Sequence, residues 1–342
     1  MSNIIQGHRL WSLLVVAALA VFPIAAPNAY YINIGVTVGI YAIVAVGLSM
    51  LAGNTGQFSI GQAAFYGIGA YVSALLNVRA GWGFLPAMAV SAAIAGLAGY
   101  AVGLTSARLR HSYLAMATVA FNLIFYVVAN EWVEVTGGVG GIGGIRVAQI
   151  AGFRFDSDLK YFYLVWAIAG GILVFSRNVL DSRPGRALNA IGQDEVSAAV
   201  AGIEVVSYKL SVFALSAAYA GIAGSLLTFY LRFVGPTPFG IHFSVTLMLM
   251  IVVGGTRSIW GSVLGASVLT MLPEGLRHLS RLSVVPPIMQ SALNDYSYHL
   301  VILGVMTFLF IVFLPGGLSG LILDLSRGNG AVKARTEAGR NA

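Results

Sequence analysis

Long apolar stretches alternate with short polar segments along almost the whole chain. A bilayer hydrocarbon core about 30 Å thick requires roughly 20 apolar residues for each helical crossing. The eighth and ninth stretches are short and flank Gly254, Gly255 and Arg257, so they form either two helices or one bent unit. On this measure the pattern predicts about ten transmembrane helices, over residues 10–26, 31–52, 58–78, 84–107, 112–130, 161–176, 209–231, 243–256, 258–275 and 297–323.

Composition supports this fold class. The chain is 58% hydrophobic and 9% charged, with a mean hydropathy of +0.85, whereas soluble domains have about 25% charged residues. The sequence therefore predicts an all-α, polytopic helical membrane protein over residues 1–326. Residues 327–342 are polar, basic and without periodicity, which predicts a disordered cytoplasmic tail. The chain has no cysteine and so no disulfide or thiolate metal site.

The distribution of Lys and Arg predicts the orientation of the helices, because cytoplasmic loops are enriched in basic residues. With a cytoplasmic N-terminus, the inner segments hold twelve of the nineteen basic residues and six of the twelve acidic ones. The net charge is then +6 inside and +1 outside. Both termini are therefore predicted to be cytoplasmic. This topology also accounts for the net positive charge of the chain. We therefore expect the lipid bilayer, and no nucleic acid, as a partner.

The first apolar stretch has a second interpretation. His8 and Arg9 precede it, and it ends in small residues around Ala25 and Ala26, as a cleaved signal peptide does. The stretch is long for the apolar part of such a peptide. Its removal would leave an external N-terminus and the same internal C-terminus.

The polar segment between the sixth and seventh stretches predicts one capped helix, over residues 183–202. Asp181 or Ser182 supplies an N-cap oxygen, Pro184 lies where no backbone N–H is needed, and Gly202 follows the last turn. Small side chains along this helix would allow another protein to approach closely. Alternatively, the helix lies at the lipid interface and its arginines contact anionic headgroups.

Polar side chains also occur at the edges of predicted spans and within them. The glycine-dense run over residues 53–57 is of a kind that is tolerated at membrane depth only beside protein or a water-filled cavity. Thr118 and Asn122 are four residues apart and share one helix face. These side chains either line a substrate pathway or satisfy neighbouring carbonyls, and the candidates are Asn54, Gln57, Ser59, Gln62, Thr118 and Asn122.

Glycine has two further patterns. Three G-x-x-x-G pairs, at 35/39, 99/103 and 261/265, predict close helix packing rather than a role in transport. A glycine-rich segment over about 131–160 lies on the predicted outer side and is too rich in glycine for a packed domain.

Three blocks of the sequence together resemble LivM-type permeases, which are subunits of ABC importers for branched-chain amino acids. The blocks are GRALNAIGQDEVSAAVAGIEVVSYKLSVFALSAAYAGIAGSLL (185–227), GNTGQFSIGQAAFYGIGAYVSALL (53–76) and LMLMIVVGGTRSIWGSVLGASVLTMLPEGLR (247–277). They cover roughly a third of the chain in the expected order. One departure is Arg257, between Thr256 and Ser258, where the family more often has glycine before the serine.

The resemblance implies a transport role without catalysis. The chain would form half of a translocation pathway in the prokaryotic cytoplasmic membrane, with a second LivH-like permease, two ATPase subunits and a periplasmic binding protein as partners, and with no cofactor. The glycine-rich segment would lie at the mouth that faces the binding protein, or else be a plain flexible connection. The family's coupling helix would correspond to 183–202, with ATPase-coupling residues Arg183, Gly185, Arg186, Ala190, Asp194, Glu195 and Gly202.

Absent motifs agree with this interpretation. No glycine is followed by lysine, so the chain has no phosphate-binding loop of its own. Apart from Glu274, near the end of the ninth stretch, no acidic residue lies inside a predicted span, which disfavours a proton- or sodium-coupled carrier and suits a neutral or zwitterionic cargo. The alternatives left open are a urea or short-amide importer, a passive channel or secondary carrier, and an assembly protein.

Overall fold

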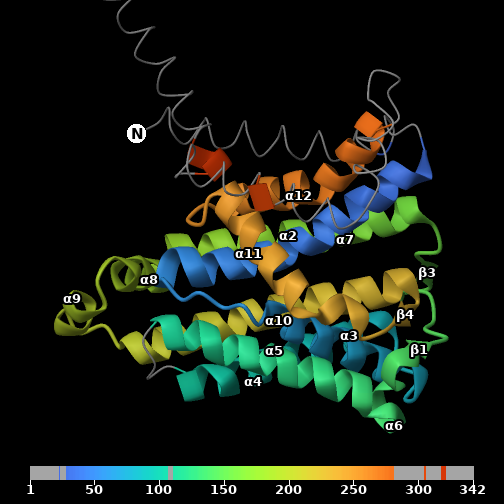
Figure 1. The fold of residues 1–342 in the computed structure, drawn as a ribbon, viewed down its shortest axis with the longest axis horizontal. Coiled ribbons are helices and arrows are strands. Elements are labelled where there is room, and N and C mark those ends of the chain that lie inside the picture. The colour runs from blue at the N-terminus through green and yellow to red at the C-terminus, as the bar shows by residue number, and fades with distance from the viewer. Residues whose placement is uncertain (1–22, 24–27, 107–110, 281–303, 306–316, 321–342) are drawn as a thin grey trace, which may run out of the picture.

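The computed structural model describes residues 23, 28–106, 111–280, 304–305 and 317–320, which are mostly helical (Figure 1). Most of the first and last predicted spans, and the tail 327–342, lie outside the described residues. The long helices are α2 (Ala29–Thr55), α3 (Gln62–Val78), α4 (Phe84–Ser106), α5 (His111–Glu131), α7 (Asp158–Asp181), α10 (Val205–Leu231), α11 (Ile241–Gly254) and α12 (Ile259–Ser280). The short ones are α6 (Val133–Thr136), η1 (Gly138–Gly140), α8 (Arg183–Gln193), α9 (Glu195–Val200) and η2 (Thr237–Phe239).

Among the described residues, five helices, namely α2, α4, α5, α7 and α10, are long and apolar enough to cross a membrane, and α11 is a shorter apolar helix. This confirms a helical membrane protein, and the total of ten spans stays a prediction. The predicted eighth and ninth stretches correspond to two separate helices, α11 and α12, joined by a turn over residues 255–258.

Helix α2 lies at the centre of the bundle. It packs against α7, α10, α11 and α12 along its length and against α8 at its C-terminal end. Of its most apolar window, 83% is buried, compared with 22% for α5. The cause is in the sequence, because α2 is apolar on every side and such a helix is buried on every side.

Glycine allows the close approach of several helices. A Cβ on Gly99 would lie 2.4 Å from the Cβ of Ala217 on α10, and one on Gly265 would lie 1.8 Å from the carbonyl oxygen of Met250 on α11. The packing role predicted for these G-x-x-x-G glycines is therefore confirmed. A comparable contact outside those pairs joins α10 to α3, at Gly224.

One end of the bundle is formed by the glycine-rich segment, here called the loop end. Strand β1 (Ile142–Gly143) pairs antiparallel with β4 (Phe233–Val234), and β2 (Gln149–Ile150) pairs with β3 (Phe153–Arg154). The backbone N–H of Arg146 donates to Asn77 Oδ1 at 2.9 Å, and the Arg79 guanidinium donates to the Glu134 carbonyl. The segment thus contacts the end of α3 and the α10–α11 connection. Its place at the mouth that faces a binding protein stays a prediction.

Replacing Gly224 with alanine is expected to destabilise the bundle. Its Cβ would lie 1.9 Å from the Tyr66 carbonyl oxygen, and overpacking of this kind costs about 1–3 kcal/mol. Thermal unfolding in lipid nanodiscs should therefore shift to lower temperature. The matched control is Gly171→Ala, because nothing lies within 4 Å of that Cβ position and alanine is favoured over glycine in helices by about 1 kcal/mol. An equal shift for both variants would contradict this account.

Candidate functional site

The polar segment after α7 forms two helices instead of the predicted one, with a corner at Asp194. The backbone of Asp194 is extended, with φ −156° and ψ 114°, and its side chain caps the second helix. Its carboxylate accepts hydrogen bonds from the Ser197 hydroxyl at 2.6 Å and the Val196 backbone N–H at 3.0 Å. These two bonds lower the pKa of Asp194, with the Ser197 bond as the larger cause. The prediction overlooked that an aspartate within a helical pattern can start a new helix.

Helix α8 packs against the end of α2. Leu188 and Ile191 are buried on its inner face. The Asn54 side-chain amide on α2 donates to Asn189 Oδ1 at 2.7 Å. A Cβ on Gly192 would lie 2.4 Å from the Asn54 carbonyl oxygen, so only glycine allows this contact without a shift. The amphipathic pattern of α8 therefore buries its apolar side within this same chain.

Helix α9 extends beyond the bundle at the end opposite the loop end (Figure 1). Its Val196 and Val200, one turn apart, are 72% and 86% exposed. The start of α9 is attached to α10, because the Lys209 ammonium forms an ion pair with Glu195. The Lys209 side chain is only 10% exposed, so this pair is partly shielded from water. Val196 and Val200 thus form an exposed apolar surface, here called the exposed tip, on a helix whose first residue is ion-paired to α10.

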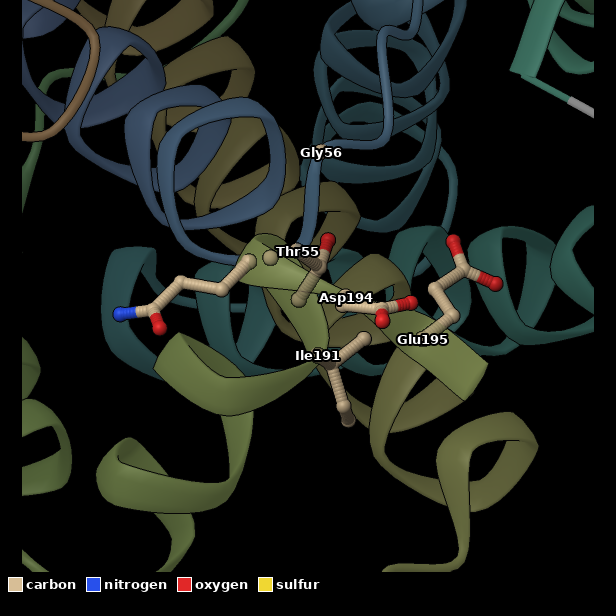
Figure 2. A pocket seen from close by; sticks show the side chains of 7 residues that line it. Thr55, Gly56, Ile191, Asp194 and Glu195 are labelled. Carbon is tan, nitrogen blue, oxygen red and sulfur yellow. The ribbon is translucent and has the colours of Figure 1, made fainter. Parts of the chain in front are cut away.

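A cavity of about 290 Å³ lies where the corner meets the end of α2. We call it the corner hollow, and Figure 2 shows Thr55, Asp194 and Glu195 around it. Its lining comes from the last turn of α2, the last turn of α8 and the start of α9. The residues are Thr55, Gly56, Ile191, Gly192, Gln193, Asp194 and Glu195.

The residues predicted for coupling lie in different environments within this region. Arg183 and Arg186 are exposed in the first turn of α8 and Ala190 is partly buried. Gly185 is buried in the first turn of α8, where a Cβ would lie 2.0 Å from the Leu180 carbonyl oxygen at the end of α7. Gly202 follows α9 with φ +82°, which agrees with its predicted position after the last turn.

Sequence reasoning missed several residues of this region. Asn189, Gly192 and Lys209 hold the two short helices in place, and Val196 and Val200 form the exposed tip. The two valines had a detectable signal, since they form an apolar i, i+4 pair in a polar segment. The pairing of Lys209 with Glu195 had none, because it depends on how α9 folds back on α10.

The residues predicted for the substrate pathway are all buried. Asn54 contacts α8, as described above, and Gln57 accepts from the Thr55 hydroxyl at 3.3 Å. The Ser59 hydroxyl accepts from the Gly61 N–H at 3.4 Å. These three therefore surround the α2–α3 connection over residues 56–61, at the same end as α8.

Three further pathway candidates lie deeper in the bundle. Thr118 accepts from the Ile60 N–H at 3.0 Å, and the Gln62 side-chain amide donates to Ser216 at 2.9 Å. Asn122 differs from them, because its side chain is fully buried and neither its nitrogen nor its oxygen has a hydrogen-bond partner. A buried unpaired amide is costly in a protein interior, so Asn122 is the clearest candidate of the six for contact with a passing solute.

The chain matches the family model described as branched-chain amino acid transport system / permease component, over residues 30–311. The fold and the sequence thus agree on the class of protein: the chain belongs to this family of transport permeases.

Among curated proteins, the chain is 30% identical to the LivM permease protein of the high-affinity branched-chain amino acid transport system of Escherichia coli. That similarity covers 96% of this chain and 80% of the relative. The corresponding Salmonella typhimurium protein is 29% identical, over 93% and 76%. A probable LivH permease of Methanocaldococcus jannaschii is 26% identical, over 66% and 74%. No solved structure matches the chain at a significant level.

Replacing Asp194 with alanine is expected to fray α9 while leaving α8 intact, because the cap acceptor is lost. Amide hydrogen exchange over residues 195–200 should become several-fold faster. Asp194→Asn is the control, since its amide oxygen still accepts and exchange should stay near wild type. Because the pKa of Asp194 is lowered, the carboxylate is charged at neutral pH, and its charge is lost only as the pH falls through the lowered pKa. Unchanged exchange in Asp194→Ala would contradict the capping role.

Proposed function

We propose that this chain is a permease subunit of an ABC importer for branched-chain or other hydrophobic amino acids. Its membrane is the prokaryotic cytoplasmic membrane, with both termini cytoplasmic. Family membership supports the transport class, and the cargo named for the LivM relatives supports the substrate class. The observation that carries the proposal is the α8–α9 corner, where an exposed apolar tip is attached to the central helix.

The corner has the properties required of a docking element. Val196 and Val200 present apolar surface that a protein partner would cover, and single helices of this length are not stable without packing. The contacts of α8 with α2 and of Glu195 with Lys209 fix α9 relative to two membrane helices. We assign this end to the cytoplasm, where two ATPase subunits dock.

Transmission from the ATPase then follows the contacts of the corner. A displacement of α9 moves α10 through the Lys209–Glu195 pair and moves the end of α2 through Asn54 and Asn189. The same end of α2 contacts the α11–α12 turn, because the Ser49 hydroxyl donates to the Thr256 carbonyl at 2.8 Å. ATP-driven closure would thus rock the helices around the pathway between outward- and inward-open states.

The remaining partners follow from the other surfaces. The outer faces of α4 and α5 are apolar and largely exposed in the single chain, which suits contact with lipid and with a second, LivH-like permease. The loop end would face a periplasmic binding protein. There, a cavity of about 200 Å³ is lined mainly by apolar residues of α10, β4 and η2, among them Leu231, Val234 and Phe239.

The docking assignment is tested by placing a charge on the exposed tip. Val200→Glu should reduce co-purification of the ATPase subunits about tenfold or more, because a carboxylate buried at an interface without a partner is strongly unfavourable. The control is Val133→Glu, which is 66% exposed on α6 at the loop end and should leave co-purification unchanged. ATPase recovery with Val200→Glu at the wild-type level would refute the assignment.

The pathway role of Asn122 is tested by separating stability from transport. Asn122→Leu removes an unpaired buried amide, a group whose burial costs about 1–3 kcal/mol, so the melting temperature should not fall. Uptake of radiolabelled leucine by the complete importer in proteoliposomes should nevertheless drop about tenfold. Ser267→Ala, which removes only a hydroxyl bonded within its own helix, should transport normally. Full uptake by Asn122→Leu would exclude Asn122 from the pathway.

A carrier that works without ATP is the competing interpretation. Proteoliposomes that contain the permeases but no ATPase subunits distinguish the two. Transport that survives removal of the ATPase would favour a passive channel or a secondary carrier.

A further inference from the structure

The corner hollow lies beside two helix C-termini, those of α2 and α8. The end of α2 contributes Thr55 and Gly56, and the end of α8 contributes Ile191, Gly192 and Gln193. The C-terminus of a helix carries about half a negative charge on its unpaired carbonyl groups, and basic side chains usually occupy its last turn. Neither α2 nor α8 has a basic residue in its last turn.

Asp194 adds a full negative charge at the same place. It accepts hydrogen bonds from the Ser197 hydroxyl and the Val196 N–H, which are both uncharged. Among the described residues, its neighbour Glu195 is the acid that pairs with Lys209. A carboxylate has about four acceptor positions, so the Asp194 carboxylate can accept from a further donor as well.

The arginines of α8 do not neutralise this negative potential. Arg183 and Arg186 belong to the first turn of the helix, so Arg186 begins about 12 Å along the axis from Asp194, at about 1.5 Å per residue. That separation exceeds the Debye length of about 8 Å at physiological ionic strength. The start of α8 is therefore positive, whereas the hollow itself is lined by Asp194, Glu195 and the two helix C-termini. Arg257, in the α11–α12 turn beside the end of α2, is the nearby base that does not line the hollow.

We propose that the corner hollow receives a lysine or arginine side chain of the ATPase subunit. A cavity of about 290 Å³ has room for the end of such a side chain, and the site offers the Asp194 carboxylate together with two helix C-termini. The cation would contact Asp194 while Val196 and Val200 cover the apolar surface beside it. This inference rests on the proposed function, because that function supplies the ATPase as the partner.

The test measures the affinity of the ATPase subunits for the permease pair in lipid nanodiscs. The affinity is measured at about 0.1 M and at about 1 M salt, where the Debye length is about 10 Å and about 3 Å respectively. Asp194→Asn keeps the acceptor that caps α9 but removes the charge, so affinity should fall about tenfold at low salt and little at high salt. Gln193→Glu adds a carboxylate at the same hollow and should raise affinity at low salt.

Glu204→Gln is the matched control, because Glu204 is a nearby exposed acid that does not line the hollow. Its affinity should equal that of the wild type at both salt concentrations. Hydrogen exchange over residues 195–200 verifies that α9 is intact in each variant.

The outcomes separate this inference from the proposed function. If Asp194→Asn binds the ATPase as tightly as the wild type at both salt concentrations, the inferred contact with a basic ATPase side chain is overturned. The docking assignment itself would still hold. Absence of ATPase binding by the wild-type pair would overturn both. An acidic substitution of one ATPase lysine or arginine that restores binding to an Asp194→Lys variant would support the inference and identify the partner residue.

Discussion

The contact between α8 and the C-terminal end of α2 is the interaction on which the rest of the structure depends. Asn54 bonds Asn189, and Gly192 lies directly against the Asn54 carbonyl. Because α2 is buried among most of the other long helices, α8 is in direct contact with the centre of the bundle. A single polar pair and a glycine thus connect a surface element to the core.

The same end of α2 connects to a second junction. A Cβ on Gly53 would lie 2.0 Å from the Thr256 carbonyl oxygen, and the Ser49 hydroxyl donates to that oxygen. The α11–α12 turn is therefore seated on the last two turns of α2. Close backbone contact of this kind transmits displacement, because packed interiors shift between discrete arrangements and do not deform gradually.

In the proposed docking, apolar and charged surface are divided between two parts of the corner. The apolar valines would supply contact area and the hollow would supply orientation, since charged groups across an interface fix register and steer association. The ion pair of Lys209 and Glu195 has a structural role instead. It is partly shielded and internal, so it holds α9 in place and leaves Asp194 as the carboxylate that a partner can use.

The sequence by itself determined the class of fold, the approximate bounds of the helices from residue 29 to 280, and the segment that forms the corner. Hydrophobic length and glycine spacing are local properties, so they are visible in one chain. Tertiary structure decided that Asn54 contacts α8 and that the glycine-rich segment pairs with residues 233–234. It also decided that Asn122 is buried without a partner. These features depend on contacts between residues far apart in the chain, and neither periodicity nor composition records which distant groups meet.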